Sequence, residues 1–380
     1  MVYLDSGASA QKPSAVIDGM RDVMENSYAN IHRGLYGMSL AASELYDEAR
    51  AKAAAFIGAP SPREIVFTKG TTEAVNLVAH SFGRSLAKGD AVIVSEAEHH
   101  SNLLPWMRIR DEAGIELRFM PLLPDGEFDY EWLSKNLGGA KLVAVTGQSN
   151  VIGVPTDVGL VCRLAHKAGA RVFVDAAQMA VHSPLDVAAA DADFLAFSGH
   201  KIYGPTGIGV LYGKLDLLRE MPPYQLGGDM VDRVGIEKAV WRGVPEKFEA
   251  GTPPIVEAAG LGLAFDFINE FGMEKIERES LELTMYAAGK LRGIGGLRIL
   301  SGARANGIVT FVADGASSFD IGTLLGEKNV CVRVGRHCAE PLHSRLGVTD
   351  SVRASFGIYN DAEDVDKFVG ALEKVLAMLR

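Results

Sequence analysis

The sequence predicts an α/β protein with a large domain, whose mostly parallel sheet is flanked by helices, and a smaller α+β domain. Three observations predict this class. Short apolar segments alternate with amphipathic helical segments through most of the chain, which is the pattern of βαβ units. The alternation stops near Pro254, where a long helical stretch begins. The chain has 380 residues, more than a single core usually spans.

The expected large domain covers residues 14–256. A helical pattern from Glu73 to about Leu86 follows its first apolar run. The strands are expected at five apolar runs: 65–67, 91–94, 142–145, 171–174 and 194–197. Ligands of parallel sheets bind beyond the carboxyl ends of the strands, so polar residues directly after these runs are the first candidates for a site.

The expected small domain combines residues 1–13 with residues 257–380 and carries the loop around Cys338. The helical stretch from Ile255 to about Leu291 would connect the two domains. The other elements of this domain are two strands and a closing helix, expected at 307–312, 330–333 and 361–380.

Composition and charge exclude several classes of partner. The formal net charge of -10 argues against a nucleic acid or an anionic membrane. No apolar run reaches the length of a transmembrane helix, and no basic leader followed by an apolar segment opens the sequence. The 3 cysteines are too few, and odd in number, for a disulfide framework. We therefore expect a soluble protein of the reducing cytoplasm.

Lys201 lies in a glycine-containing turn, Ser198-Gly199-His200-Lys201, directly after an apolar run. A lysine at the end of a strand can form a Schiff base with the aldehyde of pyridoxal phosphate. The hydroxyl of Ser198 and the imidazole of His200 can bind the phosphate. Alone, this pattern is more typical of a surface lysine, and the segments described next favour the cofactor site because such sites consist of several groups.

Asp175 ends the apolar run 171–174. A buried carboxylate needs a partner, and the ring nitrogen of pyridoxal phosphate is one. This pairing keeps the nitrogen protonated, so that the ring accepts electrons. Gln178, which follows one helical turn later, could donate to the phenolic oxygen of the ring. The alternative for Asp175 is capping of the following helix, and the two roles are compatible.

The segment Thr68-Lys69-Gly70-Thr71-Thr72-Glu73 joins an expected strand to an expected helix. Glycine lets the backbone approach a ligand closely, and the N-terminus of a helix offers free N–H groups to a phosphate. The hydroxyls of Thr71 and Thr72 add to this candidate phosphate site. Threonines cap many helices, so the position after a parallel strand is what favours the site.

His99 lies in a segment, residues 96–102, that also follows an expected strand. Its imidazole could stack on the cofactor ring and relay protons. The alternative is a metal site of His99 and His100 with His337 and Cys338. Adjacent histidines point in divergent directions, and no CxxC or HExxH spacing is present, so we expect no metal.

Cys338 is the candidate nucleophile. Three basic side chains lie close to it in the sequence: Arg333, Arg336 and His337. Positive charge favours the thiolate, which is the nucleophilic form of cysteine. Cys162 and Cys331 lie in apolar periodic segments, and we expect both to be core residues.

Together these segments resemble the cysteine desulfurases of the class V aminotransferase family, over nearly the whole chain. The turn 198–201, followed by Gly204-Pro205-Thr206-Gly207, is similar to the lysine motif of the family. The segment Arg333–Cys338 resembles the mobile-loop cysteine motif of its second group, the enzymes of the SUF system. Three further segments match the family pattern: 29–34, 149–153 and 249–253. The resemblance implies fold type I of the PLP-dependent transferases.

The resemblance also implies roles for the residues around the cofactor, pyridoxal 5'-phosphate. Lys201 would form the Schiff base, and His99 would stack on the ring. Asp175 would pair with the ring nitrogen, and Gln178 would contact the ring oxygen. The phosphate ligands would be Thr72, Ser198 and His200, together with Thr252 of a second subunit. A phosphate site shared in this way implies a homodimer.

For the substrate, L-cysteine, the resemblance assigns the carboxylate to Arg353, whose guanidinium can form two parallel hydrogen bonds. His32, Asn150 and Arg333 would line the substrate pocket. The chain also departs from the family pattern. Arg336 stands where the second group usually has a histidine, and Gly147-Gln148 stands where relatives tend to have a histidine and a valine. Relatives usually carry a helix ahead of the segment that begins here at Met1.

The implied reaction converts L-cysteine to L-alanine. Lys201 would take the proton from Cα, and the thiolate of Cys338 would attack the substrate sulfur and keep it as a persulfide. A sulfur-acceptor protein of the SUF system would then receive the sulfur for iron-sulfur cluster assembly. The alternatives are a selenocysteine lyase with the same residues and an aminotransferase or β-lyase in which Cys338 is incidental. A non-catalytic scaffold for sulfur-trafficking proteins is disfavoured because Lys201, Asp175 and His99 are all present.

Overall fold

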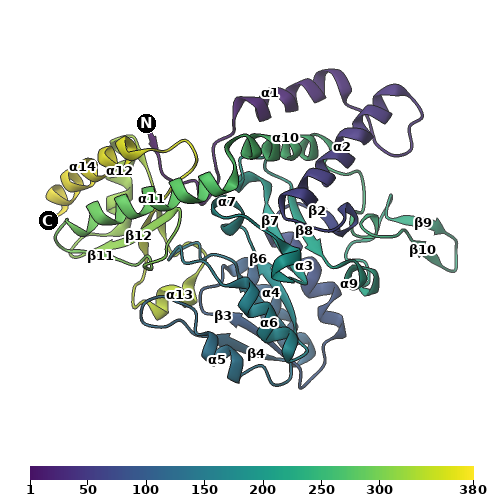
Figure 1. The fold of residues 1–380 in the computed structure, drawn as a ribbon, viewed down its shortest axis with the longest axis horizontal. Coiled ribbons are helices and arrows are strands. Elements are labelled where there is room, and N and C mark those ends of the chain that lie inside the picture. The colour runs from purple at the N-terminus through teal and green to yellow at the C-terminus, as the bar shows by residue number, and fades with distance from the viewer.

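The computed structural model describes residues 1–380 and contains two units connected by long helices (Figure 1). The larger unit is built on a seven-stranded sheet of order β2-β8-β7-β6-β5-β3-β4. Its strands are β2 (Ile65–Thr68), β3 (Ala91–Ser95), β4 (Glu116–Met120), β5 (Ala140–Thr146), β6 (Arg171–Asp175), β7 (Phe194–Ser198) and β8 (Gly209–Gly213). Strand β8 runs antiparallel to β2 and β7, and the other neighbours are parallel, which confirms the predicted class of sheet.

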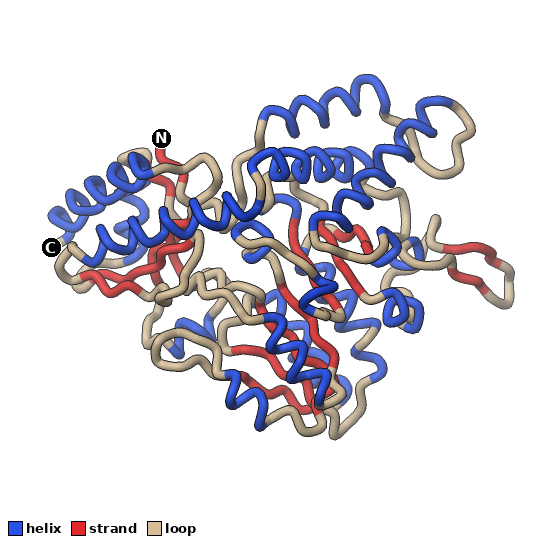
Figure 2. Tube along the Cα trace, in the orientation of Figure 1, coloured by secondary structure: helices blue, strands red, loops and turns tan.

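The inner strands of this sheet are largely apolar because both of its faces are covered (Figure 2), whereas the edge strand β4 carries charged and exposed residues. In β5, Val143 and Val145 belong to the core on one face, and Leu142 and Ala144 belong to the core on the other. The first core includes α2 (Gly37–Phe56), α6 (Val158–Lys167) and α10 (Ile255–Phe271). The second core includes α3 (Thr71–Ser81), α4 (Leu104–Ala113) and α9 (Leu215–Glu220).

The smaller unit contains a four-stranded antiparallel sheet of order β11-β12-β15-β14. These strands are β11 (Leu297–Ile299), β12 (Ile308–Ala313), β14 (Arg333–Gly335) and β15 (Ser351–Ser355). They pack with α11 (Met273–Arg292), α12 (Ser318–Glu327) and α14 (Ala362–Leu379). The first residues of the chain join this unit, because β1 (Val2–Tyr3) pairs with β13 (Val330–Cys331). The short helix α13 (Glu340–Arg345) follows the segment of Cys338.

The long helical stretch predicted from Ile255 to Leu291 is two helices, α10 and α11, separated at Gly272. This glycine has a φ of 80°, a conformation that ends a helix and that other residues rarely adopt. The side chains of α10 pack into the core of the large sheet, as Phe265 and Ile268 show. A division of the chain into domains at residue 256 remains a proposal, and this packing favours a boundary nearer Gly272.

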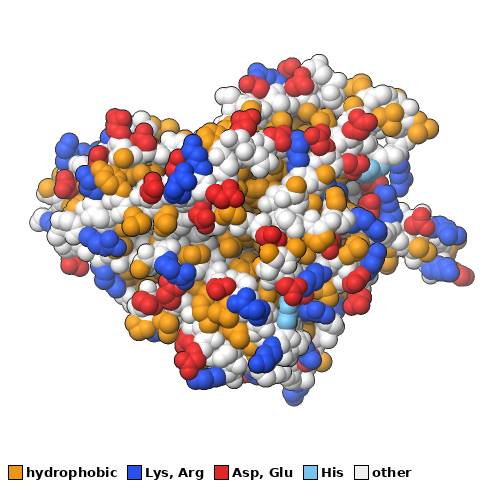
Figure 3. Space-filling model, in the orientation of Figure 1, with side chains coloured by type: hydrophobic (Ala, Val, Ile, Leu, Met, Phe, Trp, Pro, Cys, Tyr) orange, Lys and Arg blue, Asp and Glu red, His pale blue; other side chains and the backbone are white.

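The short helix α7 (Met179–His182) is largely buried. Four further features lie at the periphery of the large unit: α1 (Ser14–Asp22), α5 (Tyr130–Lys135), α8 (Val187–Ala190) and the hairpin of β9 (Val231–Val234) and β10 (Ala239–Trp241). The hairpin projects away from the body of the molecule (Figure 1). Acidic and basic side chains are interspersed over the face drawn in Figure 3. None of the helices combines the length and the apolar character that crossing a bilayer would require.

Candidate active site

A cavity of about 580 Å³ lies where the large sheet meets the small unit, beyond the carboxyl ends of β5, β6 and β7. All but two of the predicted site residues line it. They are Thr71, Thr72, His99, Asn150, Asp175, Gln178, Ser198, His200, Lys201, Arg333, Cys338 and Arg353. The alternation of strands and helices therefore brings together segments that are far apart in the sequence.

The two predicted residues outside this cavity are Thr252 and His32. Thr252 lines a separate hollow of about 320 Å³, which Tyr46 also lines. His32 has a left-handed backbone (φ 70°), and its ring lies edge-on to the ring of Tyr46 with 6.0 Å between the centroids. Neither residue lines the cavity of its own chain that contains Lys201.

Lys201 ends a 3₁₀ turn (Gly199–Lys201) that follows β7 directly. The N–H of Gly199 donates to the carbonyl of Ile208 at 2.9 Å, and this bond holds the turn against the next strand. Burial lowers the pKa of Lys201 to about 8, although the negative charge of Asp175 acts in the opposite direction. The neutral fraction of the amine near physiological pH is therefore larger than for an exposed lysine, which favours a nucleophilic role.

Asp175 is the last residue of β6, and its side chain is buried. Its Oδ1 accepts a 3.0 Å hydrogen bond from the N–H of Ala177, which belongs to the turn before α7. The helix itself begins at Met179 without a side-chain cap, so Asp175 does not act as its cap. Burial raises the pKa of Asp175, and Asp175 has no ion-pair partner within 4 Å in the chain.

Gln178 is oriented by the N-terminal segment. Its Nε2 donates to the carbonyl of Gly7 at 2.7 Å, and its Oε1 is buried without a partner in the chain. Gly7 also lines the cavity, and its N–H donates to the hydroxyl of Ser355 at 2.8 Å. The first residues of the chain thus take part in the site, which the sequence alone did not indicate.

Hydroxyl groups converge at the N-terminus of α3. The hydroxyl of Ser198 accepts from the N–H of Thr71 at 2.9 Å and lies 2.8 Å from its Oγ1. The hydroxyl of Thr72 lies 2.7 Å from that of Ser101. Gly70, with a φ of 153°, allows this approach of strand and helix. The first free N–H groups of α3 and these hydroxyls form a cradle suited to a phosphate.

His99 is partly buried beside this cradle. Its Nδ1 accepts a 3.0 Å hydrogen bond from the N–H of Ser101, so a neutral ring carries its proton on Nε2. Burial, and then the positive charge of Lys201, lowers the pKa of His99 to about 3. The ring is therefore neutral and available for stacking on a flat ligand.

These groups fit pyridoxal phosphate. A buried carboxylate without an ionic partner, Asp175, is what a protonated ring nitrogen would satisfy. The buried and unpartnered oxygen of Gln178 indicates that a polar ligand completes the site. Lys201 would hold the aldehyde, and the cradle at α3 would hold the phosphate.

Cys338 is exposed and opens on the same cavity. The large unit holds its backbone: the N–H of His100 donates to the carbonyl of Cys338 at 2.8 Å, and Nδ2 of Asn150 donates to the carbonyl of His337 at 2.8 Å. The N–H of Glu340 donates to Nε2 of His100 at 3.3 Å. From the sequence, His100 was considered only as a possible metal ligand. The structure contains no group of three or more His, Cys, Asp or Glu side chains that could hold a metal ion. Of the other cysteines, Cys162 is buried and Cys331 is partly buried.

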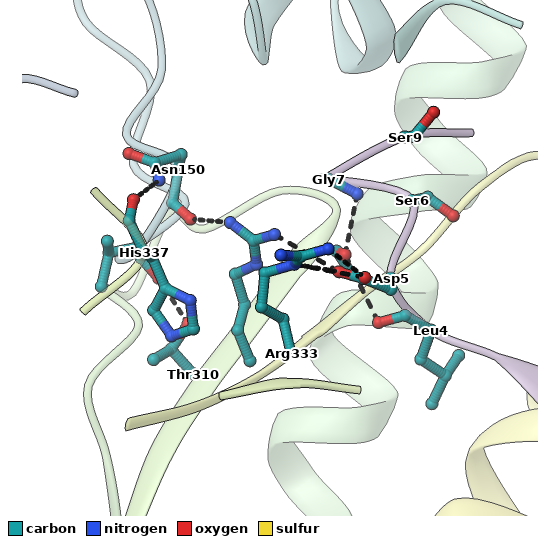
Figure 4. A network of polar contacts seen from close by, with 12 residues as sticks. Leu4, Asp5, Ser6, Gly7, Ser9, Asn150, Thr310, Arg333 and His337 are labelled. Carbon is teal, nitrogen blue, oxygen red and sulfur yellow. Dashed lines mark hydrogen bonds and ion pairs between the residues drawn. The ribbon is translucent and has the colours of Figure 1, made fainter. Parts of the chain in front are cut away.

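Asp5 joins the two arginines of the predicted substrate pocket (Figure 4). Nη2 of Arg333 lies 2.8 Å from Oδ2 of Asp5, and Nη2 of Arg353 lies 3.5 Å from Oδ1. Arg353 is buried, its Nη1 donates to the carbonyl of Asn150 at 2.9 Å, and its Nε has no partner. Burial lowers the pKa of Arg353 to about 10 although Asp5 opposes this shift. A carboxylate would satisfy this guanidinium.

Known proteins that are similar to this chain fall in one family. The family model of class V aminotransferases matches residues 2–368. A probable cysteine desulfurase of Halalkalibacterium halodurans is 43% identical over 376 residues, which cover 98% of this chain and 93% of the relative. A cysteine desulfurase of Dickeya dadantii is 43% identical over 382 residues, which cover 100% and 93%.

Solved structures show the same likeness. The cysteine desulfurase CsdA of Escherichia coli superposes with a TM-score of 0.95 at 39% identity, over 100% of this chain and 95% of that one. The apo cysteine desulfurase of Thermococcus onnurineus gives a TM-score of 0.97 at 37% identity, with the same coverage. By sequence over its whole length and by fold, the chain belongs to the class V aminotransferase family.

Proposed function

We propose that this chain, a PLP-dependent cysteine desulfurase, moves the sulfur of L-cysteine onto Cys338 and delivers it to an acceptor protein of the SUF system. The observation that carries this proposal is the position of Cys338, exposed on a segment that opens on the same cavity as Lys201. One side of the cavity can thus act on the carbon atoms of the substrate, while the other acts on its sulfur.

Bound pyridoxal phosphate supplies an electron-withdrawing ring that stabilises negative charge at Cα of the substrate. Arg353 would bind the substrate carboxylate through its unpartnered Nε and an Nη atom. The neutral amine of Lys201 would take the Cα proton, because burial keeps its pKa at about 8. His99, neutral with its proton on Nε2, would hold the ring in place and pass protons with Lys201.

The sulfur step involves Cys338 alone among the protein groups. Its thiolate would attack the sulfur of the substrate, forming an S–S bond while the C–S bond breaks. The electron pair of the C–S bond goes to Cβ, which receives a proton; Lys201 would return the Cα proton, and L-alanine leaves. Cys338 keeps the additional sulfur as a persulfide, so atoms and electrons balance without an external oxidant.

We further propose a homodimer whose partner supplies Thr252 and His32 to the site. Thr252 and Tyr46 line a hollow separate from the cavity of their own chain, and the ring of His32 lies edge-on to that of Tyr46. Large apolar side chains are exposed at Leu35 and Tyr36, which follow His32 in the chain, and at Ile236 at the tip of the β9–β10 hairpin. Covering such side chains is what favours association of two copies.

An acceptor of the SUF system and a location in the cytoplasm remain part of the proposal. The segment from Arg333 to Cys338 supports them by its resemblance to the second group of desulfurases, and none of the 3 cysteines is paired in a disulfide. Addition of a SUF acceptor protein should accelerate alanine release, and turnover of L-selenocysteine beside L-cysteine would test the preference between sulfur and selenium.

The experiment that tests the proposal is a visible spectrum of the purified protein with and without L-cysteine, followed by mass analysis of the peptide that contains Cys338. We expect a cofactor absorbance that changes on addition of L-cysteine, and one extra sulfur atom on Cys338 but not on Cys162 or Cys331. A cofactor absorbance with alanine release and no sulfur on Cys338 would overturn the assignment of the nucleophile.

A further inference from the structure

Two histidine rings meet at one serine hydroxyl behind Cys338. Nε2 of His337 and Nε2 of His343 each lie 3.0 Å from Oγ of Ser351, which is completely buried on β15. Nδ1 of His343 lies 3.0 Å from the carbonyl oxygen of Ala339, the residue that follows Cys338. Through Ser351 and His343, His337, which precedes Cys338, is therefore connected to Ala339, which follows it.

The chemistry of these groups leaves one arrangement of protons. The carbonyl of Ala339 can only accept, so Nδ1 of His343 carries the proton and its Nε2 is a bare acceptor. The hydroxyl of Ser351 must then donate to His343, and its oxygen accepts from Nε2–H of His337. Nδ1 of His337 is left as a bare acceptor, buried and without a partner.

Both rings are neutral in this arrangement. Burial, and then the positive charge of Arg353, lowers the pKa of His337 to about 2. Burial also lowers the pKa of His343. Ser351 is consequently both donor and acceptor at one buried point, a combination that no apolar side chain can replace.

The segment held in this way has an unfavourable backbone conformation. His337 and Cys338 are consecutive residues with φ values of 49° and 55°, in the left-handed region. Each such residue costs on the order of 1–2 kcal/mol and persists only where its surroundings impose it. Asn150 and His100 hold the carbonyls of this segment from the large unit, and the Ser351 network holds it from the small unit.

We propose that Ser351 and His343 are positioning residues, which hold Cys338 in the backbone conformation from which its thiolate reaches the substrate sulfur. This inference rests on the proposed role of Cys338 as the nucleophile. Neither side chain lines the cavity, so neither touches the substrate, and both act through His337 and Ala339. Loss of the network should slow the sulfur step and leave the binding of L-cysteine and the proton transfer at Cα unchanged.

The test uses the holoenzyme with the substitution Ser351→Ala. In a single turnover with L-cysteine, we expect alanine release to slow by about tenfold or more, since two buried groups lose their partner. The rapid change of cofactor absorbance on mixing and the KM for L-cysteine should stay as in the unmodified protein. Ser351→Thr, which keeps the hydroxyl, should restore the rate. Ser301→Ala is the matched control, because its hydroxyl accepts from the N–H of Thr310 in the same sheet, outside this network.

Normal alanine release by a folded Ser351→Ala protein would overturn the proposal. An equal slowing of the absorbance change and of alanine release would also overturn it, because such a result indicates only a structural role for Ser351. If Ser351→Ala does not fold, His343→Phe is the second variant, because it keeps a ring and removes both nitrogens. Its absorbance change and its alanine release are compared in the same way. Cys338→Ser separates the two claims: normal release by that variant refutes the nucleophile, whereas its inactivity together with a normal Ser351→Ala protein refutes only the positioning network.

Discussion

The side-chain amide of Asn150 donates a 2.8 Å hydrogen bond to the main-chain carbonyl of His337, so the large unit holds the residue that precedes Cys338. In Asn150→Ala, this buried carbonyl loses its partner, at a cost of about 1–3 kcal/mol. We expect alanine release to fall by roughly tenfold or more while cofactor binding persists.

Asn136→Ala is the control for this prediction, because Nδ2 of Asn136 also donates to a main-chain carbonyl, that of Trp132, at 2.8 Å. Steady-state kinetics and thermal unfolding of both variants distinguish a local effect from a general loss of stability. Unchanged turnover in Asn150→Ala would contradict the proposal that Asn150 fixes the backbone next to Cys338.

Arg353→Lys tests the recognition of the substrate carboxylate. Lysine keeps the charge but cannot form two parallel hydrogen bonds, so the KM for L-cysteine should rise by about tenfold or more with a smaller change in kcat. Arg304→Lys is the control, since Arg304 forms its hydrogen bonds with Glu127 at the surface. A KM that stays the same in a folded Arg353→Lys protein would refute this role.

The pKa of Lys201 predicts how the apoprotein takes up its cofactor. Only the neutral amine attacks an aldehyde, so the rate of uptake should rise with pH and level off above the pKa, which burial lowers to about 8. The negative charge of Asp175 raises this pKa, so Asp175→Asn should move the midpoint to lower pH. Rapid-mixing absorbance measures the midpoint. A midpoint near the ordinary lysine value of about 10.4, or an upward shift in Asp175→Asn, would be inconsistent with this environment.

The proposed dimer predicts that Ile236→Asp weakens association. The side chain of Ile236 is fully exposed at the tip of the β9–β10 hairpin, and a charge there would oppose burial against a second copy. Met378→Asp, at an exposed position of α14, serves as the control. Sedimentation at several protein concentrations should show more monomer for Ile236→Asp only. Equal dissociation of both variants, or of neither, would count against the hairpin as part of the interface.

The sequence predicted the central sheet well because strands buried on both faces are continuous apolar runs, as at 142–145 and 171–174. It did not predict β4 or β8, because β4 carries charged and exposed residues and β8 has only three apolar residues between two glycines. The break at Gly272 was also missed, because the periodicity of α10 and the periodicity of α11 are both helical and glycine alone does not end a helix.

The candidate site was predicted where a local motif carries the chemistry, as around Lys201 and Cys338. Its long-range contacts were not predicted. Asp5 lies more than 300 positions from Arg333 in the sequence, and nothing in its local segment indicates a pairing with it. Ser351 likewise carries no local signal, because only the folded arrangement of β15, α13 and the loop before α13 places its hydroxyl between the two rings.

The central claim is that Cys338 receives the sulfur, and Cys338→Ser tests it most directly. The variant should bind its cofactor and show the same early change of absorbance with L-cysteine, because Lys201, Asp175 and His99 are untouched. Alanine release should fall to a few per cent or less of that of the unmodified protein, since serine cannot form an S–S bond with the substrate. Alanine release at the unmodified rate from Cys338→Ser would contradict the account.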